Sequence, residues 1–183
     1  GQCGRNIGVQ DQLACAMGGV HLFGFGPKVE SRVQPLRISA IECNYDLLND
    51  HLMLFDTGLR RTKEAGQVIA GQAQDRESVR ELAALAEPFA KALVAGEMKL
   101  CGAVMDAAWH IKRKFVDIDQ VDAWYRHARW EGAWGGKLCG AGGGGFMLFM
   151  APPQAHSRIE VLLGLRRVPI KVGVEGSKVV YSD

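Results

Sequence analysis

The stretch GGKLCGAGGGGF, from Gly135 to Phe146, constrains the fold more than any other part of the sequence. Seven of the eleven residues from Gly135 to Gly145 are glycine, and the apolar run Phe146–Met150 follows at once. Glycine in a regular element loses about 0.5–1 kcal/mol relative to alanine, because it has more backbone freedom to give up. We therefore interpret the run as a loop whose N–H groups approach an anion or another backbone, with a flexible connector as the alternative. It is neither a Walker loop, since no GK[ST] closes it, nor a dinucleotide fingerprint, since it precedes a strand.

Length, charge and cysteines limit the class of protein. The chain has 183 residues, 48% of them hydrophobic, and a formal net charge of +2, so it can bury a core but carries no strong field. Nucleic acid or an anionic membrane is therefore not expected as a partner. The five cysteines form no CxxC pair and no cluster with metal-ligand spacing, which predicts reduced thiols in a cytoplasmic protein without a metal site. We also find no signal peptide and no apolar run long enough for a membrane helix.

Hydrophobic periodicity predicts a mixture of helices and strands. One long helix is expected to start at a Ser78/Glu81 capping box and to kink or break at Pro88. Apolar spacing predicts that the helix after it faces inward through Leu100 and Val104, with Ala107 and Ile111 on the same stripe, and that the next does so through Val121, Trp124 and Ala128. Helices are predicted at Asn6–Gly19, Thr62–Gln74, Asp75–Gly96, Glu97–Arg113, Asp117–Trp130 and about Gln154–Leu165. Strands are predicted at Val20–Phe25, Arg32–Ile38, Asp50–Gly58, Phe146–Met150, Val168–Val174 and Ser177–Ser182, and this order favours an α+β fold.

The segment GVQDQ, Gly8–Gln12, is unusually polar for the start of an apolar helix. Asp11 has two interpretations that the residues alone leave open. It could cap the helix, which is worth about 1 kcal/mol. It could instead orient or deprotonate a substrate hydroxyl, with the amides of Gln10 and Gln12 holding a polar ligand.

Together these segments resemble the later part of the GHMP-type small-molecule kinases. The chain shows GVQDQLACAMGG, then an apolar strand ending in Thr57-Gly58 with Arg61 after it, then Trp109 with Lys112, then the glycine block from Ala128 to Phe146. Within the superfamily the pattern is most similar to the D-glycero-D-manno-heptose 7-phosphate kinases. The resemblance covers essentially the whole chain.

The resemblance implies an α+β fold with two parts. Residues 1–40 would be a remnant of the N-terminal, nucleotide-side domain that carries GVQDQ. Residues 41–183 would be a C-terminal α+β domain with ferredoxin-like strand order and added helices. The implied activity is ATP- and Mg²⁺-dependent transfer of the γ-phosphate to a hydroxyl of a sugar or sugar phosphate.

The resemblance also implies roles for individual residues. Asp11 would be the catalytic carboxylate at the acceptor hydroxyl, and Gln10 and Gln12 would bind the sugar. Arg61 would bind the substrate's own phosphate, because a guanidinium forks onto phosphate oxygens, or it would be an ordinary exposed arginine. Trp109 and Lys112 are interpreted as structural. The loop near the transferred phosphates would comprise Gly140, Ala141, Gly142, Gly143, Gly144 and Gly145.

One part of the family pattern is not found in the 183 residues. The Gly-Leu-Gly-Ser-Ser-rich loop that wraps the ATP phosphates should lie upstream of Gly8, together with an acidic Mg²⁺ ligand. We therefore expect the chain alone to be inactive and to need the missing half or a second chain. The alternative is a non-catalytic, kinase-derived domain that binds a ligand or a partner protein and self-associates through exposed apolar surface.

Overall fold

The computed structural model describes residues 10–26, 35–60, 76–114, 119–140, 143–178 and 180. The chain divides into two compact units, and each is described by itself. The first unit comprises residues 1–42 and 171–183, and the second comprises residues 43–170.

The first unit contains a short helix and a pair of strands. Helix α1 runs over Gln10–Met17, and Gly18 and Gly19, with φ of 66° and 58°, end it. Strands β1 (His21–Phe25) and β2 (Pro35–Ala40) pair antiparallel. The predicted helix and strand pair are therefore confirmed, and the connection over residues 27–34 lies outside the described residues.

The end of α1 packs against a segment from the C-terminal part of the chain. The amide of Gly19 donates to the carbonyl of Val174 at 2.9 Å, and Gly18 forms an isolated bridge with Glu175. A Cβ on Gly18 would lie 2.2 Å from the backbone nitrogen of Gly176, so only glycine fits there. The strand predicted at residues 168–174 is wrong, because the last strand of the described residues ends at Val168 and the isolated bridge lies beyond that range, at Glu175.

The second unit is built on a four-stranded antiparallel sheet. Its strands are β3 (Leu52–Asp56), β4 (Gly135–Leu138), β5 (Phe146–Met150) and β6 (Arg166–Val168), in the spatial order β4-β5-β3-β6. Numbered within this unit, the order is 2-3-1-4, which is the ferredoxin-like arrangement. The expectation of an α+β fold with ferredoxin-like strand order is confirmed.

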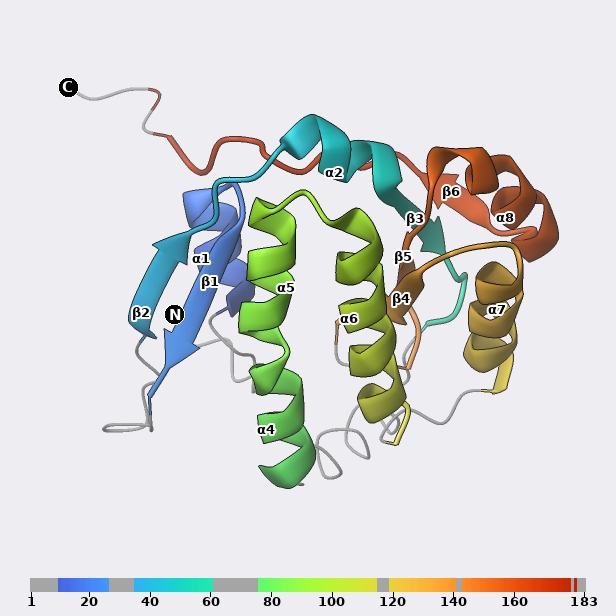
Figure 1. Cartoon of the computed structure of the whole chain (residues 1–183), viewed down its shortest axis with the longest axis horizontal. Coiled ribbons are helices and arrows are strands. Elements are labelled where there is room, and N and C mark those ends of the chain that lie inside the picture. Colours follow the sequence, from blue (N-terminus) through green and yellow to red (C-terminus); the bar gives the residue numbers. More distant parts are fainter. Residues whose placement is uncertain are drawn as a thin grey trace. The chain divides into compact units, whose positions relative to one another are not determined.

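Seven helices in the described residues of this unit surround the sheet. They are α2 (Tyr45–His51), α4 (Arg76–Ala84), α5 (Ala86–Val94), α6 (Met98–Lys112), α7 (Asp119–Trp130), the short 3₁₀-helix η1 (Pro153–Ala155) and α8 (His156–Leu163). In Figure 1, α6 lies on one side of the sheet, and α7 and α8 lie on the other. The predicted helix over residues 62–74 lies outside the described residues.

Two helix starts differ from the sequence prediction. Helix α2 was not predicted; the Asn44 side chain caps it by accepting from the Leu47 amide at 3.0 Å, so β3 begins at Leu52 and not at Asp50. The predicted capping box is wrong, because Ser78 lies inside α4 and is only 3% exposed. The break comes at Leu85, before the predicted Pro88, which lies in the first turn of α5 where a missing N–H loses no partner.

The inward face of α6 also differs from the prediction. Cys101, Met105 and Trp109 are buried, whereas Leu100, at the head of the predicted stripe, is 46% exposed. Both stripes have helical spacing, so periodicity could not choose between them. Packing chooses the stripe beside Gly102, where the helix approaches β4 closely.

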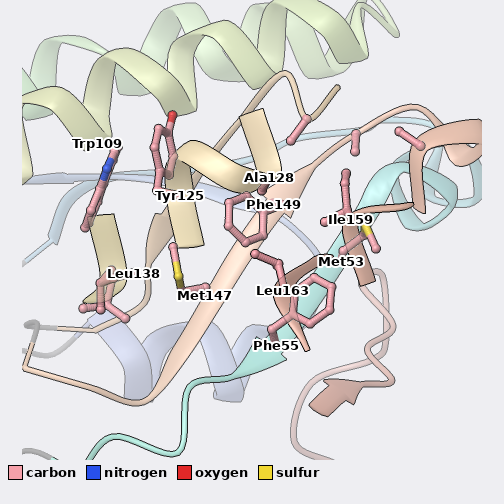
Figure 2. Close-up of a cluster of buried hydrophobic side chains, with 14 residues drawn as sticks. Met53, Phe55, Trp109, Tyr125, Ala128, Leu138, Met147, Phe149, Ile159 and Leu163 are labelled. Carbon is pink, nitrogen blue, oxygen red and sulfur yellow. The ribbon is translucent and has the colours of Figure 1, made fainter. Parts of the chain in front are cut away.

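The core of the second unit lies between the sheet and helices α7 and α8. Figure 2 shows Phe55 and Phe149 from neighbouring strands, with their ring centroids 6.1 Å apart. Met53 and Met147 share this sheet face, and Val121, Tyr125, Ala128, Ile159 and Leu163 cover it from the helices. Trp124, predicted to face inward, is half-buried against this cluster, while its neighbour Tyr125 is buried. Burial of each large side chain contributes about 1.5–3 kcal/mol, so this cluster fixes the sheet that carries the glycine run.

Candidate functional site

The glycine run has two parts with different structural roles. The interpretation of residues 135–145 as one loop is wrong for its first part, because Gly135–Leu138 forms strand β4. A Cβ on Gly135 would lie 1.9 Å from the carbonyl oxygen of Gly102 in α6, and one on Gly136 would lie 2.4 Å from the Phe149 ring. These two glycines therefore allow close packing on both sides of an edge strand.

The second part connects β4 to β5. The Cys139 amide donates to the Phe146 carbonyl at 2.8 Å and closes the hairpin. Gly143, Gly144 and Gly145 have φ of 85°, 134° and 102°, which side-chain-bearing residues rarely adopt. Of the predicted loop residues, Gly140 and these three are described, whereas positions 141 and 142 lie outside the described residues.

Thr57, at the end of β3, holds the last residue of this loop. Its amide and its Oγ1 both donate to the Gly145 carbonyl, at 2.9 and 2.6 Å. The Gly145 amide in turn donates to the Leu59 carbonyl at 3.0 Å. A Cβ on Gly144 would lie 2.3 Å from that same Leu59 oxygen, so glycine is required at this approach. Thr57 is 5% exposed, and its hydrogen bonds are therefore shielded from water.

The turn after Thr57 is held by charged side chains. The Asp56 carboxylate accepts from the Gly58 amide at 3.0 Å and from the Arg166 guanidinium at 2.7 Å. The hydrogen bond from Arg166, and then the one from Gly58, lower the pKa of Asp56. The group is exposed, so we assign the pair an ordering role and no large stabilisation.

Lys112, in the last turn of α6, holds the first residues of the loop. Its Nζ donates to the carbonyl oxygens of Leu138 and Gly140, at 2.6 and 2.5 Å. Burial lowers the pKa of Lys112 to about 8, the neighbouring charge of Lys137 acts in the same direction, and Cys139 opposes it. The structural interpretation of Lys112 is supported, and its target is the loop itself.

The described part of this loop suits an anion. Within the described residues, the amides of Gly143 and Gly144 donate no hydrogen bond, and the Lys112 ammonium lies at the loop's start. Among the same residues there is no group of three or more His, Cys, Asp or Glu side chains that could hold a metal ion. The helices in the described part are also too short or too polar to cross a membrane.

The residues of α1 that were predicted to bind the acceptor belong to a different unit from the glycine loop. Gln10, Asp11 and Gln12 are exposed in the first turn of α1, in the first unit, whereas the loop belongs to the second. Asp11 lies inside the helix, so its interpretation as the N-terminal cap is wrong. Arg61 lies outside the described residues. The convergence of Asp11 and the glycine loop on one pocket stays a prediction.

Sequence reasoning missed the contacts that hold the loop. Thr57 was noted only as a strand end, and its partner Gly145 is 88 residues away in the sequence, where no local pattern could connect them. Lys112 carried a weak signal, since a lysine three residues after a core tryptophan lies on the same helix face.

Comparison with known proteins agrees with this architecture. Residues 89–161, from α5 through β4, the glycine loop and β5 into α8, match the family model of the GHMP kinases C terminal. Over these residues the chain is similar to the C-terminal domain of GHMP kinases. The match includes the loop and its Lys112 anchor, whereas Thr57, the residue that follows β3, precedes the matched range.

Proteins and solved structures similar to this chain include kinases of sugars and sugar phosphates. The chain is 28% identical over 152 residues to a D-glycero-alpha-D-manno-heptose 7-phosphate kinase of Campylobacter jejuni, covering 80% of this chain and 44% of that protein. The crystal structure of a putative sugar kinase from Campylobacter jejuni matches with a TM-score of 0.66 and 22% identity, over 95% of this chain and 51% of the other. A D-glycero-D-manno-heptose 1-phosphate kinase from Bacteroides thetaiotaomicron matches with a TM-score of 0.62 and 21% identity, over 98% and 51%. The chain thus spans about half the length of these relatives, and the two structures show the shared fold.

Proposed function

We propose that this chain is the C-terminal part of an ATP-dependent kinase that phosphorylates a hydroxyl of a sugar or sugar phosphate of the heptose type. The observation that carries the proposal is the glycine loop of a GHMP kinase domain, anchored at both ends and with the amides of Gly143 and Gly144 uncommitted within the described residues. The similarity to a heptose 7-phosphate kinase supports the substrate class. The free thiols of Cys15, Cys43, Cys101 and Cys139 support a cytoplasmic location.

On the nucleotide side, the loop's amides would face the phosphates being transferred. Bound ATP supplies the γ-phosphoryl group, and Mg²⁺ neutralises its charge. Backbone N–H groups suit such an anion, because they carry partial positive charge and need no reorganisation. The 183 residues include no Gly-Leu-Gly-Ser-Ser-rich loop of the kind that wraps the ATP phosphates. We therefore expect the chain alone to show little or no turnover.

On the acceptor side, Asp11 would orient or deprotonate the sugar hydroxyl. An exposed carboxylate in the first turn of α1 is accessible to a ligand. Gln10 and Gln12 would bind sugar hydroxyls through their amides, and Arg61 would bind the substrate's phosphate. The reaction then depends chiefly on positioning, as in other phosphoryl transfers.

A coupled assay of ADP release with heptose 7-phosphate, ATP and Mg²⁺ tests these roles. It compares the 183-residue chain with the same chain supplied with a polypeptide that carries the upstream kinase motifs. In the active mixture, Asp11→Asn should lower kcat about 100-fold or more. The matched control is Asp119→Asn, which changes an exposed aspartate in the first turn of α7 and should leave kcat unchanged.

Two outcomes would contradict the proposal. Robust turnover by the 183-residue chain alone would show that it holds a complete nucleotide site. Equal activity of the Asp11 and Asp119 variants would remove Asp11 from the reaction.

A second candidate function has one observation in its favour. The rings of His21, Phe23 and Phe25 stack in sequence along β1, with centroids 5.9 and 6.2 Å apart, and Phe25 and the β2 residue Ile38 are each 40% exposed. Such a surface suits association with a second copy. The chain would then be a kinase-derived, non-catalytic domain that self-associates.

A further inference from the structure

Both ends of the glycine loop are tethered by side chains from outside the β4–β5 hairpin. Thr57 follows the end of β3, and its hydroxyl donates to the Gly145 carbonyl. Lys112 lies in α6, and its ammonium donates to the carbonyls of Leu138, the last residue of β4, and of Gly140. We propose that Thr57 and Lys112 are positioning residues that hold the described part of this loop, Gly140 and Gly143–Gly145, in an anion-accepting conformation. The catalytic consequence of the tethers rests on the proposed kinase function, whereas their effect on the loop does not.

The chemistry of the tethers decides their effect. Both side chains donate hydrogen bonds to carbonyl oxygens, and neither of these bonds involves a loop amide. Carbonyl oxygens carry partial negative charge and would repel a phosphate if they turned toward it. Side-chain donors that fix the carbonyls of Leu138, Gly140 and Gly145 therefore remove this repulsion, and the amides of Gly143 and Gly144 stay uncommitted within the described residues.

Glycine makes these tethers necessary. A loop with several glycines samples many backbone conformations, and ordering each residue opposes a conformational entropy of roughly 1–2 kcal/mol. The Thr57 hydroxyl is buried, and its 2.6 Å bond joins residues 88 positions apart. A valine there would keep the shape but leave the Gly145 carbonyl with one donor fewer, whereas a serine would keep the donor.

The Lys112 tether combines charge with burial. Its Nζ reaches the carbonyls of Leu138, at the end of β4, and of Gly140, in the loop. Charge-assisted hydrogen bonds of this kind are about twice as strong as neutral ones. The groups whose charges act on Lys112 are Lys137 and Cys139, at the end of β4 and the start of the loop. With a pKa of about 8, Lys112 is mostly an ammonium at pH 7 and loses its charge above pH 8. The tether should therefore weaken in that range.

The first test uses amide hydrogen exchange and NMR on the 183-residue chain. Thr57→Val should speed exchange of the Gly145 amide about tenfold relative to its intrinsic rate, and Thr57→Ser should restore the wild-type rate. Lys112→Met should do the same at the Cys139 amide, while the control Lys91→Met, at an exposed lysine of α5, should not. The Phe149 amide in the core reports any global loss of stability, which would move all amides together. The glycine shifts should also titrate near pH 8 in the wild type and lose this step in Lys112→Met.

The second test uses the active mixture described above. Thr57→Val and Lys112→Met should each lower kcat about tenfold or more and leave KM for the sugar phosphate within about twofold, and Thr57→Ser should recover kcat. Unchanged exchange in the variants, together with a titration step near pH 8 that persists in Lys112→Met, would overturn the tethers. Altered exchange with no kinase activity in any wild-type mixture would support the tethers and contradict the proposed function instead.

Discussion

Gly135 and Gly136 are consecutive glycines, and each allows a different close contact that a side chain would block. Gly135 faces the backbone of α6, and Gly136 faces the ring of Phe149. Backbone conformation does not require glycine at either position, because neither residue has a positive φ. The sequence predicted a glycine-dependent approach of another backbone, but it could not locate that approach in a strand.

We expect Gly135→Ala to destabilise the protein by about 3 kcal/mol or more, because a Cβ would overlap rigid helix backbone. The control is Gly164→Ala, at a φ of 60° with no atom within 4 Å of the new Cβ, which should cost about 1 kcal/mol. Urea unfolding at equilibrium measures both. Equal losses would show that α6 does not approach β4 as closely as described.

The charge of Lys112 should affect stability as well as the loop. Its pKa is about 8 in the folded protein, against an ordinary value of 10.5. Between these values the unfolded chain binds a proton that the folded protein lacks, so the free energy of unfolding should rise with pH. The rise contributed by this residue is about 3 kcal/mol at most across that range. Urea titrations at pH 7.5 and 10 should show it in the wild type, and Lys112→Met should lack it.

At the scale of single elements, the sequence predicted where a helix lies better than it predicted which face of the helix is buried. Helix α6 was predicted at Glu97–Arg113 and observed at Met98–Lys112, yet its buried stripe is shifted from Leu100 to Cys101. Hydrophobic spacing constrains a helix to be amphipathic, but two adjacent stripes satisfy it equally. The choice depends on Gly102 meeting Gly135, which are far apart in the sequence.

The shifted stripe predicts unequal effects of two similar substitutions in α6. Met105→Ala removes a side chain that is 6% exposed and should cost about 2–5 kcal/mol. Leu100→Ala truncates a side chain that is 46% exposed and should change stability by about 0.5 kcal/mol or less. Thermal or urea unfolding compares them directly, and the reverse order would restore the face predicted from the sequence.

At the scale of the whole chain, the resemblance to a known family predicted more than the physical patterns alone. The patterns alone predicted an α+β protein with a glycine-rich loop that could bind an anion, and left the role of Asp11 open. Resemblance added the kinase domain, which the match over residues 89–161 supports, and the ferredoxin-like order, which the sheet confirms. The roles of Asp11, Gln10, Gln12 and Arg61 stay predictions, because they depend on how distant segments meet.

The exposed apolar residues of β1 and β2 predict self-association of the 183-residue chain. Light scattering should give a mass above 19.9 kDa for one copy. Phe25→Ser combined with Ile38→Ser should shift the protein toward monomer, because both side chains are 40% exposed on this strand pair. The control Val161→Ser, at a residue of α8 that is 84% exposed, should leave the mass unchanged. A wild-type monomer at all concentrations would contradict the prediction.

The second unit is inserted between the two chain segments of the first unit, and the bridge between Gly18 and Glu175 joins those two segments. A stop codon or a protease cut near residue 171 would spare every strand of the ferredoxin-like sheet and yet remove the backbone that clasps the end of α1. Loss of the C-terminal segment would therefore destabilise the end of α1, the helix that carries Asp11. Affinity tags and truncations at the C-terminus should therefore be judged by their effect on the N-terminal helix.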